Sequence, residues 1–426
     1  MHRTGGIASI LLMACSTGFE DLLHDGGSTA SDPSSVDRGN TLPMDAGDSQ
    51  WGGRPFHGYL VEALVSEPDL DEALRQAMSE DELVGLSFAI SVDNELRYLT
   101  GLGVADREAG TPVDPRTSRF RWASVSKGLV GLVALHRHIH GALDFNVDYQ
   151  EIAPGLGYPT AYLPTGCRDA ACSLPLPLTH PVISLRRLLD HTAGVQHYSN
   201  GLENPAPSSD LTNDPEVNTG MAWALSRFLT QPLISLPGQR WSYSSFGYNL
   251  AGVILEENQG QGLASQVDEL IAEPLGLTSL GPDVHWHDTA DRVRGYRRDR
   301  QGIRWNGDDD VSWKLAAGGF QSTPLDFAGW CAGLLGDTLL DDRTKRDILW
   351  KSEDPARAYA FGFEVTRDRQ GIIDSVGHGG AQQSVRTALK AYPNEGLCFT
   401  LMTNSTWADA PGLLGRFEQI WREAQE

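Results

Sequence analysis

One serine and one lysine in this sequence are spaced to act as a nucleophile and its base. Ser124 and Lys127 form an S-x-x-K pattern, and no other lysine in the chain has a serine three residues before it. If a helix begins at Ser124, residues i and i+3 share a face, so the amine lies beside the hydroxyl. A buried lysine has a lowered pKa and can accept the serine proton, which activates the hydroxyl for acyl transfer. The alternative is a surface serine beside a lysine that only packs its stem.

The elements around this pair predict a rigid support. Residues 85–92 and 96–104 form a hairpin pattern before it, and residues 128–135 are apolar nearly all round, which indicates a buried helix. Helical runs are at 68–79, 185–189, 221–229, 248–257 and 407–424, and later β-type runs are at 360–365, 372–376, 385–392 and 397–402. This order predicts an α/β fold with one antiparallel sheet, built from both ends of the chain and flanked by helices. An all-helical insertion is expected at about 141–315.

Two later segments carry further polar groups. Residues 237–250 (PGQRWSYSSFGYNL) contain Tyr243 and Ser245, and residues 377–381 (GHGGA) are expected in the connection between two strands. The chain thus has S-x-x-K, then Tyr-x-Ser, then His-x-Gly. This order resembles that of the penicillin-recognising serine hydrolases, which have S-x-x-K, then Tyr-x-Asn, then either Lys-Thr-Gly or His-x-Gly. That family includes class C β-lactamases, D-alanyl-D-alanine carboxypeptidases, esterases and the mitochondrial β-lactamase-like peptidase.

Connecting segments extend this resemblance over about residues 65 to 423. Residues 184–195 (SLRRLLDHTAGV) are similar to the family's LLxHTSG stretch. Residues 273–277 (EPLGL) and 316–323 (AAGGFQST) are similar to its xPLGM and AGGxxST segments. The resemblance implies the β-lactamase and transpeptidase fold, with the site where the sheet meets the helical part.

The resemblance also implies a role for each catalytic side chain. Ser124 is acylated, Lys127 takes its proton, and Tyr243 relays protons to the leaving group and from water. His378 polarises the site or contacts the substrate. The backbone N–H groups of Ser124 and Ala381 form the oxyanion hole, and no metal or organic cofactor takes part.

Substrate contacts are implied at Ser245, Gly379 and Gly380, and two positions depart from the family pattern. Ser245 stands for an asparagine, and His378 stands for a lysine that attracts a substrate carboxylate. A neutral histidine attracts a carboxylate less at pH 7. Both changes favour an esterase or peptidase over a β-lactamase or D-Ala-D-Ala carboxypeptidase. Simpler interpretations are a packed core tyrosine at 243 and a capped strand-end histidine at 378.

Functions of other classes remain open at this stage. One is a penicillin-binding sensor that is acylated once without turnover, and another is a structural envelope lipoprotein on an inactive hydrolase fold. The net charge of −22 disfavours a nucleic-acid partner. The expected partner is therefore a small-molecule or peptide substrate.

The first residues are typical of an export signal. Residues 7–14 are a short apolar run that ends at Cys15, as in a bacterial lipobox. We expect a lipoprotein signal peptide at 1–15, lipidation of Cys15, a disordered Gly/Ser/Asp-rich tether at 16–55 and a hydrolase domain at 56–426. The protein would then be exported and anchored to the cell envelope, on the periplasmic or outer-surface side. The alternative is an ordinary signal peptide with an incidental cysteine.

The remaining cysteines and two polar clusters give smaller predictions. Cys167 and Cys172 are expected to form a loop disulfide, and Cys331 and Cys398 to be buried thiols. Residues 308–310, three aspartates, are expected to form a solvated acidic loop. The histidines at 136, 138 and 140 are expected at a solvated helix end, with metal binding as the alternative.

Overall fold

A large antiparallel sheet joins the two ends of the hydrolase region. The computed structural model describes residues 67–156, 182–198, 220–229, 231–284, 289, 291–307, 309–353 and 357–426. The sheet has eight strands in the order β3-β2-β1-β13-β12-β11-β10-β9. Strand β1 pairs with β2 on one side and with β13 on the other, so strands far apart in sequence are neighbours at the centre. The predicted sheet, built from both ends of the chain, is confirmed.

The strands of this sheet are β1 (Gly85–Val92), β2 (Glu95–Asp106), β3 (Thr111–Pro112), β9 (Tyr359–Ala360), β10 (Phe363–Arg367), β11 (Ile373–Gln382), β12 (Val385–Tyr392) and β13 (Leu397–Thr403). Two small sheets contain β4 (Phe120–Arg121), β5 (Gly281–Pro282) and β8 (Phe320–Ser322), and β6 (Tyr296–Asp299) with β7 (Gly302–Trp305). The turn between β1 and β2 uses Asp93 and Asn94, both at positive φ, as a tight hairpin requires.

The α-helices are α1 (Pro68–Glu80), α2 (Lys127–Ile139), α3 (Tyr149–Ile152), α4 (Leu185–Leu189), α5 (Gly220–Phe228), α6 (Ser245–Gln259), α7 (Leu263–Val267), α8 (Glu273–Leu275), α9 (Leu315–Gly318), α10 (Pro324–Leu335), α11 (Asp342–Thr344) and α12 (Ala410–Ala424). Short helical turns are η1 (Ala123–Ser126), η2 (Pro154–Leu156), η5 (Asp268–Ala272), η6 (Ser312–Lys314) and η7 (Lys345–Leu349).

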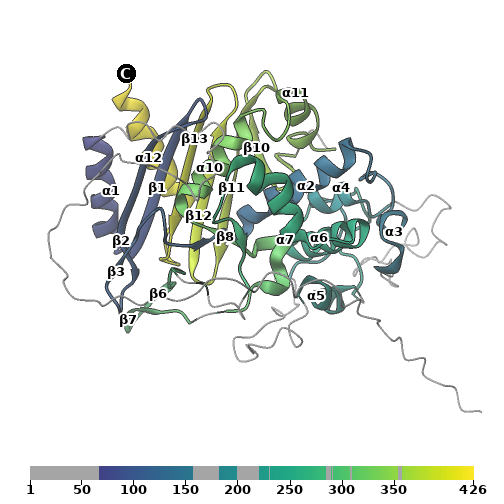
Figure 1. Ribbon diagram of the computed structural model, residues 1–426, viewed down its shortest axis with the longest axis horizontal. Helices are drawn as coiled ribbons and strands as arrows, with labels where there is room; N and C mark the ends of the chain where they lie inside the picture. The colour runs from purple at the N-terminus through teal and green to yellow at the C-terminus, as the bar shows by residue number, and fades with distance from the viewer. Residues whose placement is uncertain are drawn as a thin grey trace, which may run out of the picture. The chain divides into compact units, whose positions relative to one another are not determined.

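Helices cover both faces of the sheet, which explains why β1 is buried along nearly its whole length. Helices α1 and α12 lie on one face (Figure 1). There Leu74 and Phe417 join Phe88 and Phe399 in one apolar cluster. Helix α10 packs on the opposite face through Leu325, Ala328 and Ala332, which contact Ala89 and Leu96. Because both of its faces are buried, β1 does not show the alternation of buried and exposed residues that is typical of a half-exposed strand.

Three local features differ from the sequence-based expectation. The predicted helical insertion also contains β5 and the β6–β7 hairpin, in which residues 296–299 pair with residues 302–305 and Gly302, directly after the turn, has positive φ. The predicted strand 360–365 is two strands, since Phe361 and Gly362 both have positive φ and reverse the chain. Residues 377–381 lie inside β11, where they pair with β12.

Candidate active site

Ser124 lies in a helical turn between β4 and α2. The turn η1 covers Ala123–Ser126, and α2 begins only at Lys127, so the regular helix starts three residues later than the S-x-x-K pattern predicts. Ala123 has φ 50°, a left-handed conformation that costs energy for a residue with a side chain. The serine is half-buried in the turn that leads into α2, whose residues Lys127–Leu135 are all buried. The backbone therefore presents its hydroxyl from a fixed position.

Lys127 places its amine beside this hydroxyl. Its Nζ lies 3.2 Å from Ser124 Oγ and donates to the carbonyl oxygen of Ala317 at 2.5 Å. The side chain is fully buried. Burial, with a smaller contribution from the nearby charge of Lys314, lowers the pKa of Lys127 well below the usual lysine value. A neutral amine with one N–H bonded to a carbonyl keeps a lone pair for the serine proton.

Tyr243 reaches Ser124 from the other side. Its hydroxyl donates to Ser124 Oγ at 2.8 Å, and Lys127 Nζ lies 4.9 Å from the centre of its ring. Burial raises the pKa of Tyr243, so the phenol keeps its proton at neutral pH. The residue comes from the irregular segment just before α6. Two groups thus meet at the Ser124 oxygen, one from a residue three positions away and one from a residue 119 positions away.

Strand β11 passes next to this turn at Gly380. A Cβ atom on Gly380 would collide with Thr387 Oγ1 and would lie 2.6 Å from the carbonyl oxygen of Trp122. Thr387 donates its hydroxyl to the same Trp122 oxygen at 3.0 Å. The missing side chain therefore lets the strand approach the residues just before Ser124. Ala381, whose N–H is the expected second oxyanion donor, follows directly and is exposed.

His378 lies beside Tyr243, with ring centres 6.3 Å apart. Its Nδ1 lies 2.6 Å from the carbonyl oxygen of Gly379, so this nitrogen carries the proton, and its Nε2 accepts from the Tyr359 hydroxyl at 3.1 Å. Burial, with a smaller effect of the Lys127 charge, lowers the pKa of His378 to about 3. The ring is therefore neutral at pH 7, and both nitrogens have partners within the protein.

The remaining predicted contact residues lie in different surroundings. Ser245 is the buried first residue of α6, and its N–H donates to His197 Nδ1 at 3.1 Å. Gly379 faces away from Gly380, and a Cβ there would meet only Pro411 of α12 at 3.4 Å. The structure thus brings Ser245 next to Tyr243 and directs Gly379 toward the opposite face of the sheet.

Sequence reasoning missed two residues of this site. Tyr359 bonds His378 and is fully enclosed, but it lies in no recognisable motif. His191 is also buried, with its ring centre 4.4 Å from that of Tyr243. His191 is part of the segment 184–195, so its position in that motif was the available signal.

The aspartates at 309 and 310 are buried, so the expected solvated loop is wrong at these positions. Arg121 forms ion pairs with Asp283 and Asp309, and Arg292 Nη2 lies 2.5 Å from Asp283 Oδ1. Asp310 accepts from the N–H of Ser312 at 2.9 Å. Asp309 is buried because Arg121, a buried guanidinium three residues before Ser124, needs a partner inside the protein. Residue 308 lies outside the described residues.

Cys331 and Cys398 form a disulfide rather than two buried thiols. The bond joins α10 to β13, with Cα atoms 6.1 Å apart. The sequence interpretation was wrong because the residues are 67 positions apart and meet only where the helix packs on the sheet. Cys15, Cys167 and Cys172 lie outside the described residues. In the described part of the chain, no helix is both long and apolar enough to cross a membrane.

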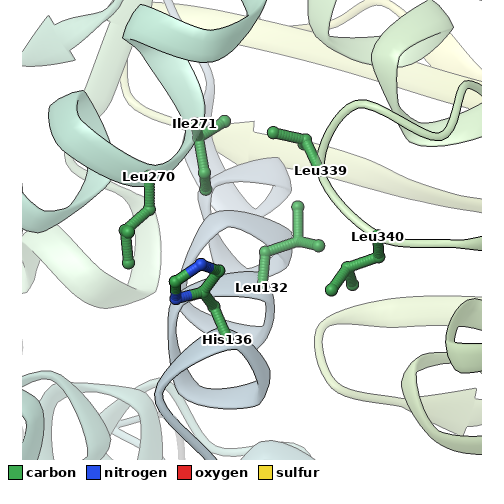
Figure 2. Close-up of a pocket in the computed structure, with 6 residues that line it drawn as sticks. All are labelled: Leu132, His136, Leu270, Ile271, Leu339 and Leu340. Atoms are coloured by element: carbon green, nitrogen blue, oxygen red, sulfur yellow. The ribbon is translucent and has the colours of Figure 1, made fainter. Parts of the chain in front are cut away.

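One of the three histidines near the end of α2, His136, lines a small and mainly apolar hollow. His136 and His140 stack with ring centres 4.0 Å apart, and His136 lines the hollow with Leu132, Leu270, Ile271, Leu339 and Leu340 (Figure 2). Within the described ranges, no group of three or more His, Cys, Asp or Glu side chains is arranged to hold a metal ion. The His136 ring thus has aliphatic neighbours on α2, η5 and the segment before α11.

The chain is similar in sequence to a curated esterase and to curated β-lactamases. Esterase EstB of Burkholderia gladioli is 30% identical over 230 residues, covering 52% of this chain and 53% of the relative. A Beta-lactamase of Providencia stuartii is 23% identical over 242 residues, covering 57% of this chain and 54% of that protein. The chain thus spans about half the length of these curated relatives.

Solved structures match over more of the chain. A penicillin binding protein from Bacillus halodurans superposes with a TM-score of 0.66 at 19% identity, covering 83% of this chain and 100% of that one. EstCE1, described as a hydrolase with promiscuous acyltransferase activity, gives 0.62 at 21% identity, covering 84% and 97%. These similarities show a common fold. The family model described as Beta-lactamase matches residues 70–414, and the chain belongs to the Beta-lactamase family.

Proposed function

We propose that this protein is a serine hydrolase that cleaves esters through a covalent acyl-enzyme on Ser124. The observation that carries the proposal is the convergence of two groups on one oxygen: Lys127 Nζ at 3.2 Å and the Tyr243 hydroxyl at 2.8 Å from Ser124 Oγ. A nucleophile within hydrogen-bond reach of a base and a proton relay is the general arrangement of covalent acyl transfer.

The reaction follows from these contacts. Ser124 Oγ attacks the acyl carbon while its proton passes to Lys127 Nζ, and the new oxyanion accepts from the N–H groups of Ser124 and Ala381. Tyr243 delivers its proton to the leaving oxygen and regains one from Lys127, so the leaving oxygen departs as an alcohol, an ester remains on Ser124 and the Lys127 amine is neutral again. Water then attacks this ester, its proton passes to the same base, and the acid is released as Ser124 regains its proton.

The surroundings of His378 favour esters over carboxylate-bearing substrates. The family's lysine at this position attracts a carboxylate, whereas the His378 ring is neutral because burial lowers its pKa to about 3. Both ring nitrogens are already bonded, to Gly379 and Tyr359. The carboxylate of a β-lactam or of a D-Ala-D-Ala peptide would therefore lack the electrostatic attraction that a lysine ammonium group supplies at this position. Esterase EstB, a relative 30% identical, is named for ester cleavage.

A substrate panel tests this proposal. The protein is assayed with p-nitrophenyl esters of short acids, a chromogenic cephalosporin and a D-Ala-D-Ala peptide. We expect repeated turnover of the esters and much lower rates with the other two. A burst of one product per protein without turnover would indicate a sensor that stays acylated, and no ester cleavage with no labelling of Ser124 would contradict the proposal.

We also propose export and a lipid anchor at Cys15. The apolar run that ends in Leu12, Met13, Ala14 and Cys15 supports it, and so does the Cys331–Cys398 disulfide, since such bonds persist in oxidising compartments. Stable anchoring needs more than one acyl chain. Cys15→Ser should release the protein from membranes, whereas a mature protein that begins after Cys15 and carries no lipid mass would contradict the anchor.

A further inference from the structure

The segment that carries Tyr243 has no regular secondary structure to hold it. Residues 239–244 precede α6 without forming a helix or strand. The backbone N–H groups of Ser242 and Ser244, the two neighbours of Tyr243, have no partner within a helix or strand and need acceptors from elsewhere in the protein. The loop after α4 supplies them, beginning at His191.

His191 holds the backbone on both sides of Tyr243. Its carbonyl oxygen accepts from the N–H of Ser242 at 2.8 Å, and its Nδ1 accepts from the N–H of Ser244 at 3.1 Å. The ring is 2% exposed and packs against the Tyr243 ring, with centres 4.4 Å apart. One residue therefore holds the backbone N–H groups of both neighbours of Tyr243 and packs against the tyrosine ring.

The state of the His191 ring follows from these contacts. A ring nitrogen that accepts a hydrogen bond cannot carry a proton, so the ring is neutral with its proton on Nε2. Burial, followed by the charge of Lys127, lowers the pKa of His191 well below the usual histidine value. The residue also has φ 59°, a left-handed conformation that aims its carbonyl at Ser242.

His197 repeats the contact one residue further along. Its Nδ1 accepts from the N–H of Ser245 at 3.1 Å, and its ring meets the Tyr243 ring edge-on with centres 5.5 Å apart. Burial, followed by the charge of Lys127, lowers the pKa of His197 to about 4, so this ring too is a neutral acceptor at pH 7.

We propose that His191 and His197 are positioning residues that hold the Tyr243 hydroxyl against Ser124 Oγ. The inference deepens the proposed function and rests on it, since it assigns the support of the proton relay. Both rings bond backbone N–H groups, so they act through Tyr243 and not on the substrate.

Two substitutions at each histidine separate the loss of the hydrogen-bond acceptor from the loss of the volume that the imidazole ring fills. Asparagine carries an acceptor oxygen near the place of Nδ1 and tolerates the left-handed conformation at position 191. Leucine fills a similar volume without an acceptor. The variants are His191→Asn, His191→Leu, His197→Asn and His197→Leu, each made in the full chain and again with Tyr243→Phe.

We expect the leucine variants to lose about 100-fold in kcat, as a small displacement of a catalytic group does, with KM little changed. The asparagine variants should recover most of the loss. With Tyr243→Phe in place, leucine should cost almost nothing further, because the hydroxyl that the histidines position is already absent.

A leucine variant that loses the same factor in both backgrounds, or that keeps the wild-type kcat, would overturn the inference. If His191→Leu does not fold, the His197 pair, which has no left-handed conformation to preserve, decides the question. Failure of the proposed function is distinguishable, because the wild-type protein would then show no hydrolysis that depends on Ser124.

Discussion

A lysine amine in water keeps its proton at neutral pH and cannot act as a base. At position 127 the amine is buried, near the second lysine at 314, and both conditions disfavour its charged form. The amine 3.2 Å from Ser124 Oγ thus has a lowered pKa, which favours the neutral form that a base requires. The proposed role of Lys127 as a base depends on this combination of contact and burial.

Substitution of the three central side chains should therefore have graded effects. We expect Ser124→Ala and Lys127→Ala each to lower kcat for p-nitrophenyl esters by about 10⁴-fold or more, and the double variant to be little worse, since the two act as a unit. Tyr243→Phe should cost about 100- to 10,000-fold. Steady-state kinetics measure these losses, and a serine-directed phosphonate should label Ser124. A label on Ser126 or Ser244 would contradict the assignment.

The pH dependence of ester hydrolysis should report Lys127. Activity needs the neutral amine, so kcat/KM should rise with pH through the pKa of Lys127 and be established well below the pH where a free lysine titrates. The charge of Lys314 lowers this pKa, so Lys314→Met should raise it and shift the acidic limb to higher pH. Lys314→Arg keeps the charge and serves as the control. An acidic limb that is the same in wild type and Lys314→Met would contradict this coupling.

At the scale of elements, the site depends on how closely β11 approaches η1. Gly380 lies against Trp122 and Thr387, and a side chain there would collide with both. Gly379, its neighbour, points to the other face and would meet Pro411 only at an ordinary contact distance. Adjacent glycines of one strand thus have different tolerance for a methyl group.

We expect Gly380→Ala to push β11 away from the turn that carries Ser124 and to lower kcat by about 100-fold, because misplacement of about 1 Å has that cost. Gly379→Ala is the matched control and should keep most of the activity. Kinetics on both variants, with circular dichroism to verify folding, test this. Equal activities of the two variants would show that the close approach is unnecessary.

At the scale of the whole molecule, the Cys331–Cys398 disulfide joins α10 to a central strand of the sheet. The bond closes a loop with a sequence separation of 67 residues. Loop-closure entropy for such a length corresponds to about 4 kcal/mol of stability. In the sequence, α10 precedes and β13 follows residues 359–382, which contain Tyr359 and His378, so the bond closes a loop that includes this part of the site.

Reduction, or the double variant Cys331→Ala/Cys398→Ala, should therefore lower the free energy of unfolding by about 4 kcal/mol. Chemical denaturation with and without reductant measures the change. Protein from an oxidising compartment should yield no free thiol at these positions when it is alkylated after unfolding without reductant. Two alkylated thiols there would restore the interpretation of separate buried cysteines.

Local pattern was sufficient for several features of the fold and of the site. Hydrophobic runs predicted strand 385–392 with the bounds of β12, and helix 185–189 with those of α4, because side-chain periodicity depends on the residue's own element. The spacing of Ser124 and Lys127 predicted their contact for the same reason. The resemblance of separated motifs added Tyr243, whose contact with Ser124 spans 119 positions.

Only the tertiary structure decided the features that depend on long-range contacts. Asp309 is buried because Arg121 is its partner across 188 positions, although three consecutive aspartates are typical of a solvated loop. Cys331 and Cys398 pair because α10 packs on β13, and His378 is held by Tyr359 because β9 folds back near β11. The sequence by itself determined most of the local elements and the contact between Ser124 and Lys127, which lies within one turn of a helix. The partners of buried polar groups were decided by packing between elements, which no local spacing encodes.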